Sequence, residues 1–241
     1  MHVFPDLAAA CHALAADLAR QASDRIAQHG RFGLVVPGGE SPRGLFQELS
    51  GRWRAEVPWS GVDLFWSDER AVEPEDDRSN YRVAVQALLP LPGLAPSNIH
   101  RIHGEERPLA TAARGYEWEL HRWGGATPKA WAGFDAVVLG VGPDGHTASL
   151  FPGSATLEER ENLVAVEPWP AREPKVPRIT LTLRALAGAR RIAFLASGAD
   201  KAEAIARSTR PAEPGVRTPA SLVEQEFRPE WYLDEAAASG L

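Results

Sequence analysis

The stretch FDAVVLGVGPDGHTASLFPG (134–153) joins a buried strand to a polar, glycine-rich turn. Phe134–Leu139 is an almost unbroken apolar run, as is typical of a parallel strand that helices cover on both faces. The turn ends on His146, and we expect a helix to begin there and to run to Phe151. A buried strand followed by a glycine-rich turn and a helix indicates an α/β protein.

The alternation of strands and helices continues on both sides of this stretch. Apolar runs predict strands over 32–36, 62–66, 98–102, 162–166, 179–183 and 191–196. Amphipathic segments predict helices over 7–28, closed by Gly30, and over 42–49, 79–89, 109–123 and 199–206. This order predicts an α/β fold with a Rossmann-like, doubly wound, mostly parallel sheet and helices on both faces. No segment has the composition of a linker, so we expect one domain over residues 1–241.

Composition and charge exclude several classes of partner. The formal net charge is -6 and there is no long basic run, so we expect no nucleic acid partner. No apolar run approaches the roughly 18 residues of a membrane span, and the helix over 7–28 contains Asp17 and Asp24, so we expect neither a membrane partner nor a leader. Cys11 is the only cysteine, which suits a reducing compartment. We therefore expect a cytoplasmic protein that is a monomer or a small homo-oligomer.

Polar turns follow three of the predicted strands. They are PGGES (37–41), SDER (67–70) and GVGPDGH (140–146). Ligands of open α/β sheets bind beyond the carboxyl ends of the strands. We therefore expect one small-molecule site in which these three turns come together.

The first turn suits a phosphate group. Gly38 and Gly39 let the backbone approach an anion closely, while Ser41 and the N-terminus of the following helix supply hydrogen-bond donors. Glu40 is an unfavourable neighbour for a phosphate. The alternative interpretation is an ordinary tight turn in which Ser41 caps the helix.

Three cations are candidates for binding the phosphate. Arg70 would bind it through a two-pronged contact while Asp68 binds a sugar hydroxyl; the alternative is a surface salt-bridge cluster. Lys201 follows the last predicted strand, either as a phosphate ligand or as a solvated helix lysine. Arg178 starts a strand after the Pro-rich loop 167–177, and we expect it to reach the site with that loop as a lid.

The third turn contains the candidate catalytic pair. A helix N-terminus disfavours a positive charge, so the imidazole of His146 would stay neutral near pH 7 and accept a proton, with Asp144 orienting it. The alternative is a surface histidine without a function. Pro143 and Asp144 interrupt the glycine pattern, which argues against a dinucleotide fingerprint. The other histidines, including the pair His100 and His103, lack convincing metal-ligand spacing, so we expect no metal and no cofactor.

Taken together, these turns resemble those of the 6-phosphogluconolactonase family, within the glucosamine-6-phosphate isomerase/6-phosphogluconolactonase superfamily. The resemblance covers nearly the whole chain. It includes the 134–153 stretch and the segments PGGESP (37–42), WSDERAV (66–72), SNY (79–81), RITLT (178–182), FLASGADKAEAI (194–205) and PASLV (219–223). It departs at Glu40, because the family usually has Gly-Gly-Ser-Thr-Pro in the first turn.

The resemblance implies a Rossmann-like sheet and a specific reaction without a cofactor. That reaction is hydrolysis of 6-phospho-D-glucono-1,5-lactone to 6-phosphogluconate, in the oxidative pentose phosphate pathway. The family's catalytic histidine falls on His146. Its sugar-phosphate contacts fall on Gly39, Ser41, Asp68, Arg70, Asn80, Arg178 and Lys201.

The expected mechanism is general base catalysis. His146 takes a proton from a water molecule that attacks the lactone carbonyl, and backbone N–H groups from Gly142 to Gly145 stabilise the oxyanion. Two alternatives stay open. One is an amino-sugar phosphate isomerase or deaminase in which Asp68 acts as a base, and the other is a non-catalytic sugar-phosphate-binding protein.

Overall fold

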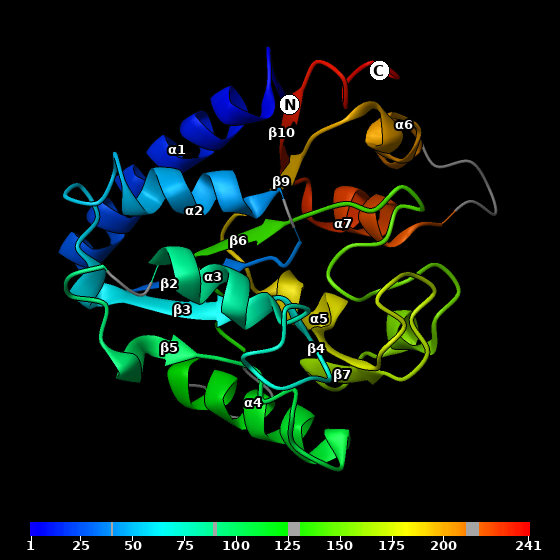
Figure 1. Ribbon diagram of the computed structural model, residues 1–241, viewed down its shortest axis with the longest axis horizontal. Coiled ribbons are helices and arrows are strands. Elements are labelled where there is room, and N and C mark those ends of the chain that lie inside the picture. The colour runs from blue at the N-terminus through cyan, green and yellow to red at the C-terminus, as the bar shows by residue number, and fades with distance from the viewer. Residues whose placement is uncertain (40, 89–90, 125–130, 211–216) are drawn as a thin grey trace.

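The structure, a computed structural model, describes residues 1–39, 41–88, 91–124, 131–210 and 217–241, and within these ranges seven parallel strands form the central sheet (Figure 1). Their order across the sheet is β1 (His2–Phe4), β10 (Glu230–Asp234), β9 (Ile192–Ala196), β6 (Ala136–Leu139), β2 (Phe32–Val36), β3 (Val62–Trp66) and β5 (Ile99–His100). The predicted α/β fold with a mostly parallel sheet is confirmed, although β1 and β10 were not predicted and β5 is shorter than the expected 98–102.

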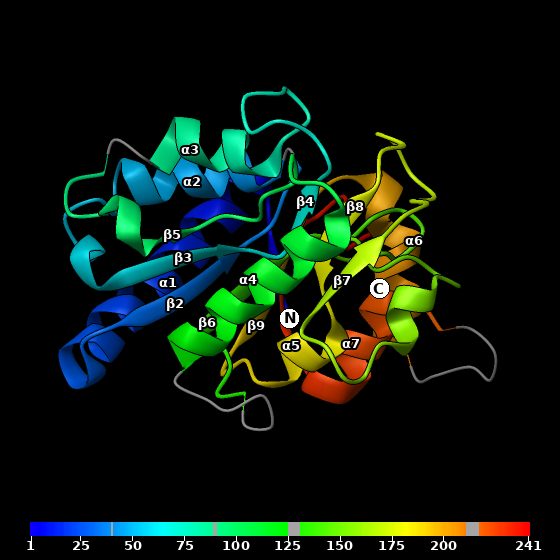
Figure 2. The same cartoon turned by 90° about the horizontal axis from the view of Figure 1, so that it is seen from below.

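Helices cover both faces of the central sheet, as predicted (Figure 2). On one face, Phe32 and Leu34 of β2 share a small apolar cavity with Leu49. On the other face, Gly33 lies against the ring of Trp123, where a Cβ atom would come within 2.4 Å of the indole. Successive strand residues point to opposite faces, so the helices that carry Leu49 and Trp123 lie on opposite sides. The helices are α1 (Leu7–His29), α2 (Pro42–Ser50), α3 (Asn80–Leu88), α4 (Leu109–Gly124), α5 (Leu183–Ala187), α6 (Ala202–Thr209) and α7 (Pro219–Phe227).

A second, antiparallel sheet lies beyond the carboxyl ends of the central strands. It consists of β4 (Asp68–Arg70), β8 (Arg178–Leu181) and β7 (Val164–Glu167), in that order. The structure corrects two expectations here: residues 67–70 were predicted to be a turn, and the segments 162–166 and 179–183 were predicted to join the parallel sheet. Ser67 connects the two sheets, because its N–H donates to the carbonyl of Val36 (3.0 Å) and its carbonyl accepts from Leu181 (2.8 Å).

The predicted helix from His146 to Phe151 is absent from this described segment. Residues 147–150 form a tight turn in which Leu150 N–H donates to the carbonyl of Thr147 (3.0 Å) and Ala148 has a φ of 49°. The backbone N–H of Ser149 instead donates to the hydroxyl of Thr180 in β8 (3.1 Å). The segment therefore forms a hydrogen bond to the second sheet in place of helical hydrogen bonds within itself. Since no helix begins at His146, no helix dipole acts on its imidazole.

Candidate active site

A cavity of about 350 Å³ opens at the carboxyl ends of the central strands, between the two sheets. Nine of the predicted site residues line it: Gly38, Gly39, Ser41, Asp68, Arg70, Gly142, His146, Arg178 and Lys201. The other two, Asp144 and Asn80, contact lining residues from behind. A larger cavity of about 800 Å³, lined by residues that include Phe151, Glu167 and Trp169, contains none of the predicted site residues.

His146 and Asp144 form a hydrogen-bonded dyad after the end of β6. The Nδ1 atom of His146 lies 2.5 Å from Oδ1 of Asp144, and the ring packs against Phe151 with a centroid separation of 4.7 Å. Gly142 makes this arrangement possible, because a Cβ atom there would lie 2.1 Å from Nδ1 and Cε1 of the imidazole. With Nδ1–H donated to the carboxylate, the remaining ring nitrogen, Nε2, is the basic one.

The carboxylate of Asp144 is held in its ionised form. Burial raises its pKa, but the hydrogen bond and charge of His146 and a hydrogen bond from Arg172 outweigh burial, so the pKa lies below the ordinary range of a carboxyl group. The Nε of Arg172 donates to Oδ2 at 3.1 Å, while Oδ1 faces His146. The dyad therefore has the geometry of a base with an orienting carboxylate.

Two backbone N–H groups of the third turn are used in hydrogen bonds within the turn. Gly142 N–H donates to the carbonyl of His146 (2.9 Å), and Gly145 N–H donates to the carbonyl of Gly142 (2.9 Å). Proline at position 143 has no N–H. The N–H groups of Gly142 and Gly145 are therefore already used within the turn, which argues against their expected role as oxyanion donors.

Asp68 lies buried in the cavity wall and accepts hydrogen bonds from two other residues. Ser149 Oγ donates to Oδ2 (2.6 Å), and Asn80 Nδ2 donates to Oδ1 (3.0 Å) and to the Asp68 carbonyl (2.8 Å). Gly38 faces the Asn80 amide so closely that a Cβ atom would lie 1.9 Å from Oδ1. Asn80 was expected to contact substrate. In the structure it begins α3, donates hydrogen bonds to Asp68 of β4 and packs against Gly38 of the first turn, so it connects these three segments.

Glu69 is a buried residue of this region that the sequence did not reveal. Its carboxylate accepts hydrogen bonds from the N–H groups of Asn80 and Tyr81 (both 2.8 Å) and from Ser79 Oγ (3.0 Å), so it binds the N-terminus of α3. Burial raises its pKa, and these backbone hydrogen bonds oppose the rise. The only sequence signal was Ser79 at the start of α3, which says nothing about a carboxylate ten residues earlier.

Arg70 and Arg178 form one cationic wall of the cavity. They lie opposite each other across the β4–β8 pair. Within the described residues, the buried Nε atom of each lacks a hydrogen-bond partner. Burial lowers the pKa of Arg178, whose guanidinium also packs over Phe151 at 5.3 Å from the ring centroid. Two neighbouring like charges, each with a buried and unused Nε donor, favour an anion or a polar oxygen between them.

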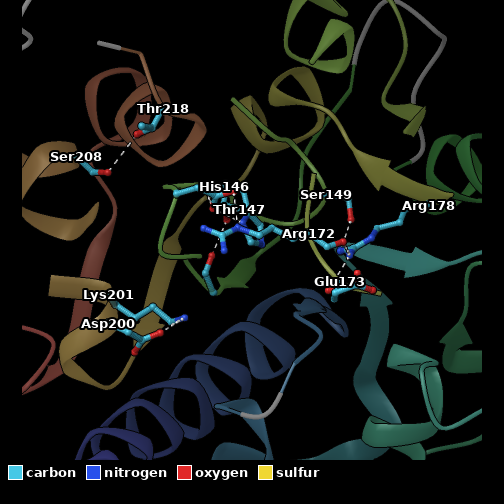
Figure 3. A network of polar contacts seen from close by, with 12 residues as sticks. His146, Thr147, Ser149, Arg172, Glu173, Arg178, Asp200, Lys201, Ser208 and Thr218 are labelled. Atoms are coloured by element: carbon cyan, nitrogen blue, oxygen red, sulfur yellow. Dashed lines mark hydrogen bonds and ion pairs between the residues drawn. The ribbon is translucent and has the colours of Figure 1, made fainter. Parts of the chain in front are cut away.

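Lys201 and Ser41 belong to another part of the wall. Lys201 follows β9, and its Nζ lies 2.8 Å from Oδ2 of Asp200. Figure 3 shows Lys201 and Arg178 on different sides of His146. Ser41 is the N-cap residue of α2, as the alternative interpretation has it, but its hydroxyl makes no capping hydrogen bond. Glu40, the departure from the family pattern, lies outside the described residues.

No metal site is evident in the part of the chain that the structure describes. No group of three or more His, Cys, Asp or Glu side chains there has the arrangement to hold a metal ion. His100 instead lies between Asp63 and Glu119, and His103 contacts Glu105. Within the same ranges, every helix is too short or too polar to span a lipid bilayer.

Comparison with known proteins gives a consistent result over the whole fold. The family model described as glucosamine-6-phosphate isomerases/6-phosphogluconolactonase matches residues 5–231. A 6-phosphogluconolactonase of Streptomyces coelicolor is 37% identical over 237 residues, which are 95% of this chain and 89% of the relative. The crystal structure of 6-phosphogluconolactonase from Leishmania guyanensis superposes with a TM-score of 0.85 at 26% identity, covering 100% of this chain and 97% of the other. A monomeric glucosamine-6-phosphate deaminase shares the fold, with a TM-score of 0.81 at 21% identity and full coverage of both chains. The chain belongs to the glucosamine-6-phosphate isomerase/6-phosphogluconolactonase family.

Proposed function

We propose that the chain hydrolyses 6-phospho-D-glucono-1,5-lactone to 6-phospho-D-gluconate, with His146 as the general base. The observation that carries this proposal is the 2.5 Å contact between His146 Nδ1 and the ionised Asp144, at the edge of a cavity lined by three cations. Relatives named 6-phosphogluconolactonase match almost the whole chain, which supports the same reaction here.

In this reaction His146 first takes a proton from the attacking water and later gives a proton to the ring oxygen that leaves C1. Nε2 of His146 takes a proton from water as the water oxygen bonds to C1 of the lactone, and the carbonyl electrons move to its oxygen. When the oxyanion collapses, the bond between C1 and the ring oxygen breaks, and the imidazolium returns the proton to that oxygen. Asp144 stabilises the imidazolium between the two steps. The products are a carboxylic acid, which ionises in water, and a free hydroxyl; no cofactor takes part.

Two groups of the substrate bind to positive charge: the phosphate and the lactone carbonyl oxygen, which becomes an oxyanion. The cavity has two cationic regions, Lys201 on one side and the pair Arg70 and Arg178 on the other. We assign the phosphate to Lys201 together with Gly39, Ser41 and the N-terminus of α2, because such a turn presents N–H groups to an anion. Arg70 and Arg178 then face the lactone carbonyl and the sugar hydroxyls, and the Asp68 carboxylate accepts a hydrogen bond from a sugar hydroxyl. Since the N–H groups of Gly142 and Gly145 are used within the third turn, we assign stabilisation of the oxyanion to Arg70 and Arg178.

The deaminase alternative requires Asp68 to remove a proton from a sugar carbon. Each carboxylate oxygen of Asp68 already accepts a hydrogen bond, from Ser149 and from Asn80, so both oxygens are engaged within the protein. Ammonia release from glucosamine 6-phosphate would reveal that activity. A catalytically silent sugar-phosphate-binding protein would bind the phosphate without either reaction.

The decisive experiment follows the opening of freshly generated 6-phosphogluconolactone, coupled to 6-phosphogluconate dehydrogenase, against spontaneous hydrolysis. We expect a rate proportional to protein concentration. His146→Ala should remove about a hundredfold to ten-thousandfold of the rate, the usual contribution of general acid–base catalysis, while the protein remains folded. A wild-type rate equal to the background would overturn the proposal, and an active His146→Ala variant would overturn the role of His146.

We further propose that residues 1–241 act as one domain, as a monomer or small homo-oligomer in the cytoplasm. Cys11, the only cysteine, is buried and suits a reducing compartment. Light scattering of the purified chain gives the oligomeric state directly.

A further inference from the structure

The Pro-rich loop between β7 and β8 is anchored by a single buried side chain. Arg178 Nη2 lies within hydrogen-bond distance of the carbonyl oxygens of Arg172 (3.1 Å), Glu173 (3.3 Å) and Pro174 (3.2 Å). Only 3% of the Arg178 surface is exposed. Three consecutive carbonyls therefore converge on one guanidinium, which fixes the backbone from which the Arg172 side chain extends.

From this anchored backbone, Arg172 reaches the catalytic dyad. Its Nε donates to Oδ2 of Asp144 at 3.1 Å, while Oδ1 of the same carboxylate faces Nδ1 of His146. Figure 3 shows Arg172 next to His146. Each carboxylate oxygen thus has its own partner, so the carboxylate cannot rotate without breaking one of the two contacts. Arg172 is not among the described residues that line the cavity, whereas His146, which binds the other oxygen of Asp144, is.

We propose that Arg172 is a positioning residue for the dyad: it holds the Asp144 carboxylate so that Oδ1 keeps the His146 imidazole in the tautomer with a free Nε2. This inference rests on the proposed lactone hydrolysis. It also gives the Pro-rich loop a role that differs from that of a simple lid. The loop supplies Arg172, the first residue in the hydrogen-bonded chain Arg172–Asp144–His146, which is called the relay below. The same guanidinium of Arg178 that lines the cavity anchors this loop.

The exposure of Arg172 separates this role from a structural one. Its side chain is 45% exposed, and an ion pair in such a setting contributes little to the stability of the fold. A misplaced base, in contrast, lowers the rate directly, because proton transfer depends steeply on geometry. Loss of Arg172 should therefore affect kcat and leave thermal stability nearly unchanged.

The test compares Arg172→Ala, Arg172→Lys and a control, Arg207→Ala, in the full chain. Arg207 pairs with a surface carboxylate of α6, Glu203, and is not among the described cavity-lining residues. We expect Arg172→Ala to lower kcat about tenfold with KM within about twofold of wild type. Arg172→Lys, which keeps the charge and one donor, should recover most of the rate, and Arg207→Ala should behave as wild type.

The pH profile gives a readout that a structural role would not move. The charged and titratable groups around His146 are Asp144, Arg172 behind it, and Asp68, Arg70, Arg178 and Lys201 of the cavity. Removing the positive charge of Arg172 makes the protonated dyad easier to form, so the acidic limb of the kcat/KM profile should move to higher pH. Arg172→Lys should return it toward the wild-type position.

Proton NMR of the free protein tests the relay without substrate. The Nδ1–H proton of His146, held at a short distance from Asp144, should give a downfield signal that is lost or broadened in Arg172→Ala and kept in Arg172→Lys. Unchanged kcat, pH profile and proton signal in Arg172→Ala would overturn the inference, as would a raised KM at unchanged kcat, which indicates direct substrate contact. If wild type has no lactonase activity, the proposed function fails, and the NMR comparison alone then decides whether Arg172 orders the dyad.

Discussion

Arg70 and Arg178 face each other directly across the antiparallel strands β4 and β8. Like charges in such positions destabilise a sheet unless other groups compensate. The carbonyls of residues 172–174 do so for Arg178, and the carbonyl of Arg78 does so for Arg70 at 2.7 Å. Within the described residues, the buried Nε atoms of both arginines lack hydrogen-bond partners, and such unpaired donors lower the stability of the fold. The same two donors are available to bind an oxygen atom of a ligand.

The two cationic regions of the cavity should separate in kinetics. Lys201→Ala removes a partner of the ground-state phosphate and should raise KM about tenfold or more with a smaller change in kcat, because uniform binding is lost. Arg70→Ala removes a partner of the developing oxyanion and should lower kcat about a hundredfold. Initial rates over a range of lactone concentrations give both constants. The reverse pattern would exchange the two assignments.

The Asp144→Asn variant tests the orientation of the dyad. An amide in this place can donate to Nδ1 of His146, which moves the ring proton to Nε2 and removes the acceptor for water. We expect kcat to fall about a hundredfold or more while the fold persists. Steady-state rates together with circular dichroism measure the two effects. Activity close to wild type would show that His146 needs no orienting carboxylate.

Gly142 offers a steric test with a matched control in the same turn. A Cβ atom at Gly142 would lie 2.1 Å from the His146 ring and 2.7 Å from Oδ1 of Asp144, whereas one at Gly140 meets nothing within 4 Å. Gly142→Ala should therefore displace the imidazole and lower kcat about a hundredfold. Gly140→Ala should keep kcat within about threefold of wild type. Equal effects of the two substitutions would contradict the steric argument.

The sequence predicted the parts of this site that depend on local pattern. The apolar runs 32–36 and 62–66 coincide with β2 and β3, and Gly30 closes α1 with a φ of 79°, as expected. Because parallel strands end at one edge of a sheet, the residues placed in the following turns also meet in one cavity.

What the sequence did not reveal depends on contacts between distant segments. Asp68–Arg70 has the polar composition of a turn, yet it pairs with Arg178–Thr180, more than a hundred residues away, and becomes a strand. The expected helix after His146 gives way to a turn because Ser149 binds Thr180 and Asp68 instead. Local periodicity contains no information about such partners, and for the same reason it did not reveal the contact between Arg172 and Asp144.

His100 provides a test of electrostatics away from the cavity. Its ring lies 3.1 Å from Oδ1 of Asp63 and 3.5 Å from Oε2 of Glu119, and it stacks on Phe65 with the centroids 4.4 Å apart. Burial lowers the pKa of His100, but the hydrogen bonds and charges of the two carboxylates outweigh burial and raise the pKa to about 9. The positively charged imidazole of His100 therefore stabilises the folded protein through its contacts with Asp63 and Glu119.

The sign of the effect on stability follows from this shift. The unfolded histidine has a pKa of about 6.5. Because the folded pKa is higher, the contribution of His100 is complete below about pH 6.5 and is lost as the pH rises to about 9. His100→Gln should thus lower the free energy of unfolding by about 1–3 kcal/mol at pH 6 and by clearly less at pH 9.5. Urea unfolding of both proteins at pH 6, 7.5 and 9.5 measures this difference. A difference that stays constant with pH would mean that the imidazole between Asp63 and Glu119 is not charged in the folded state.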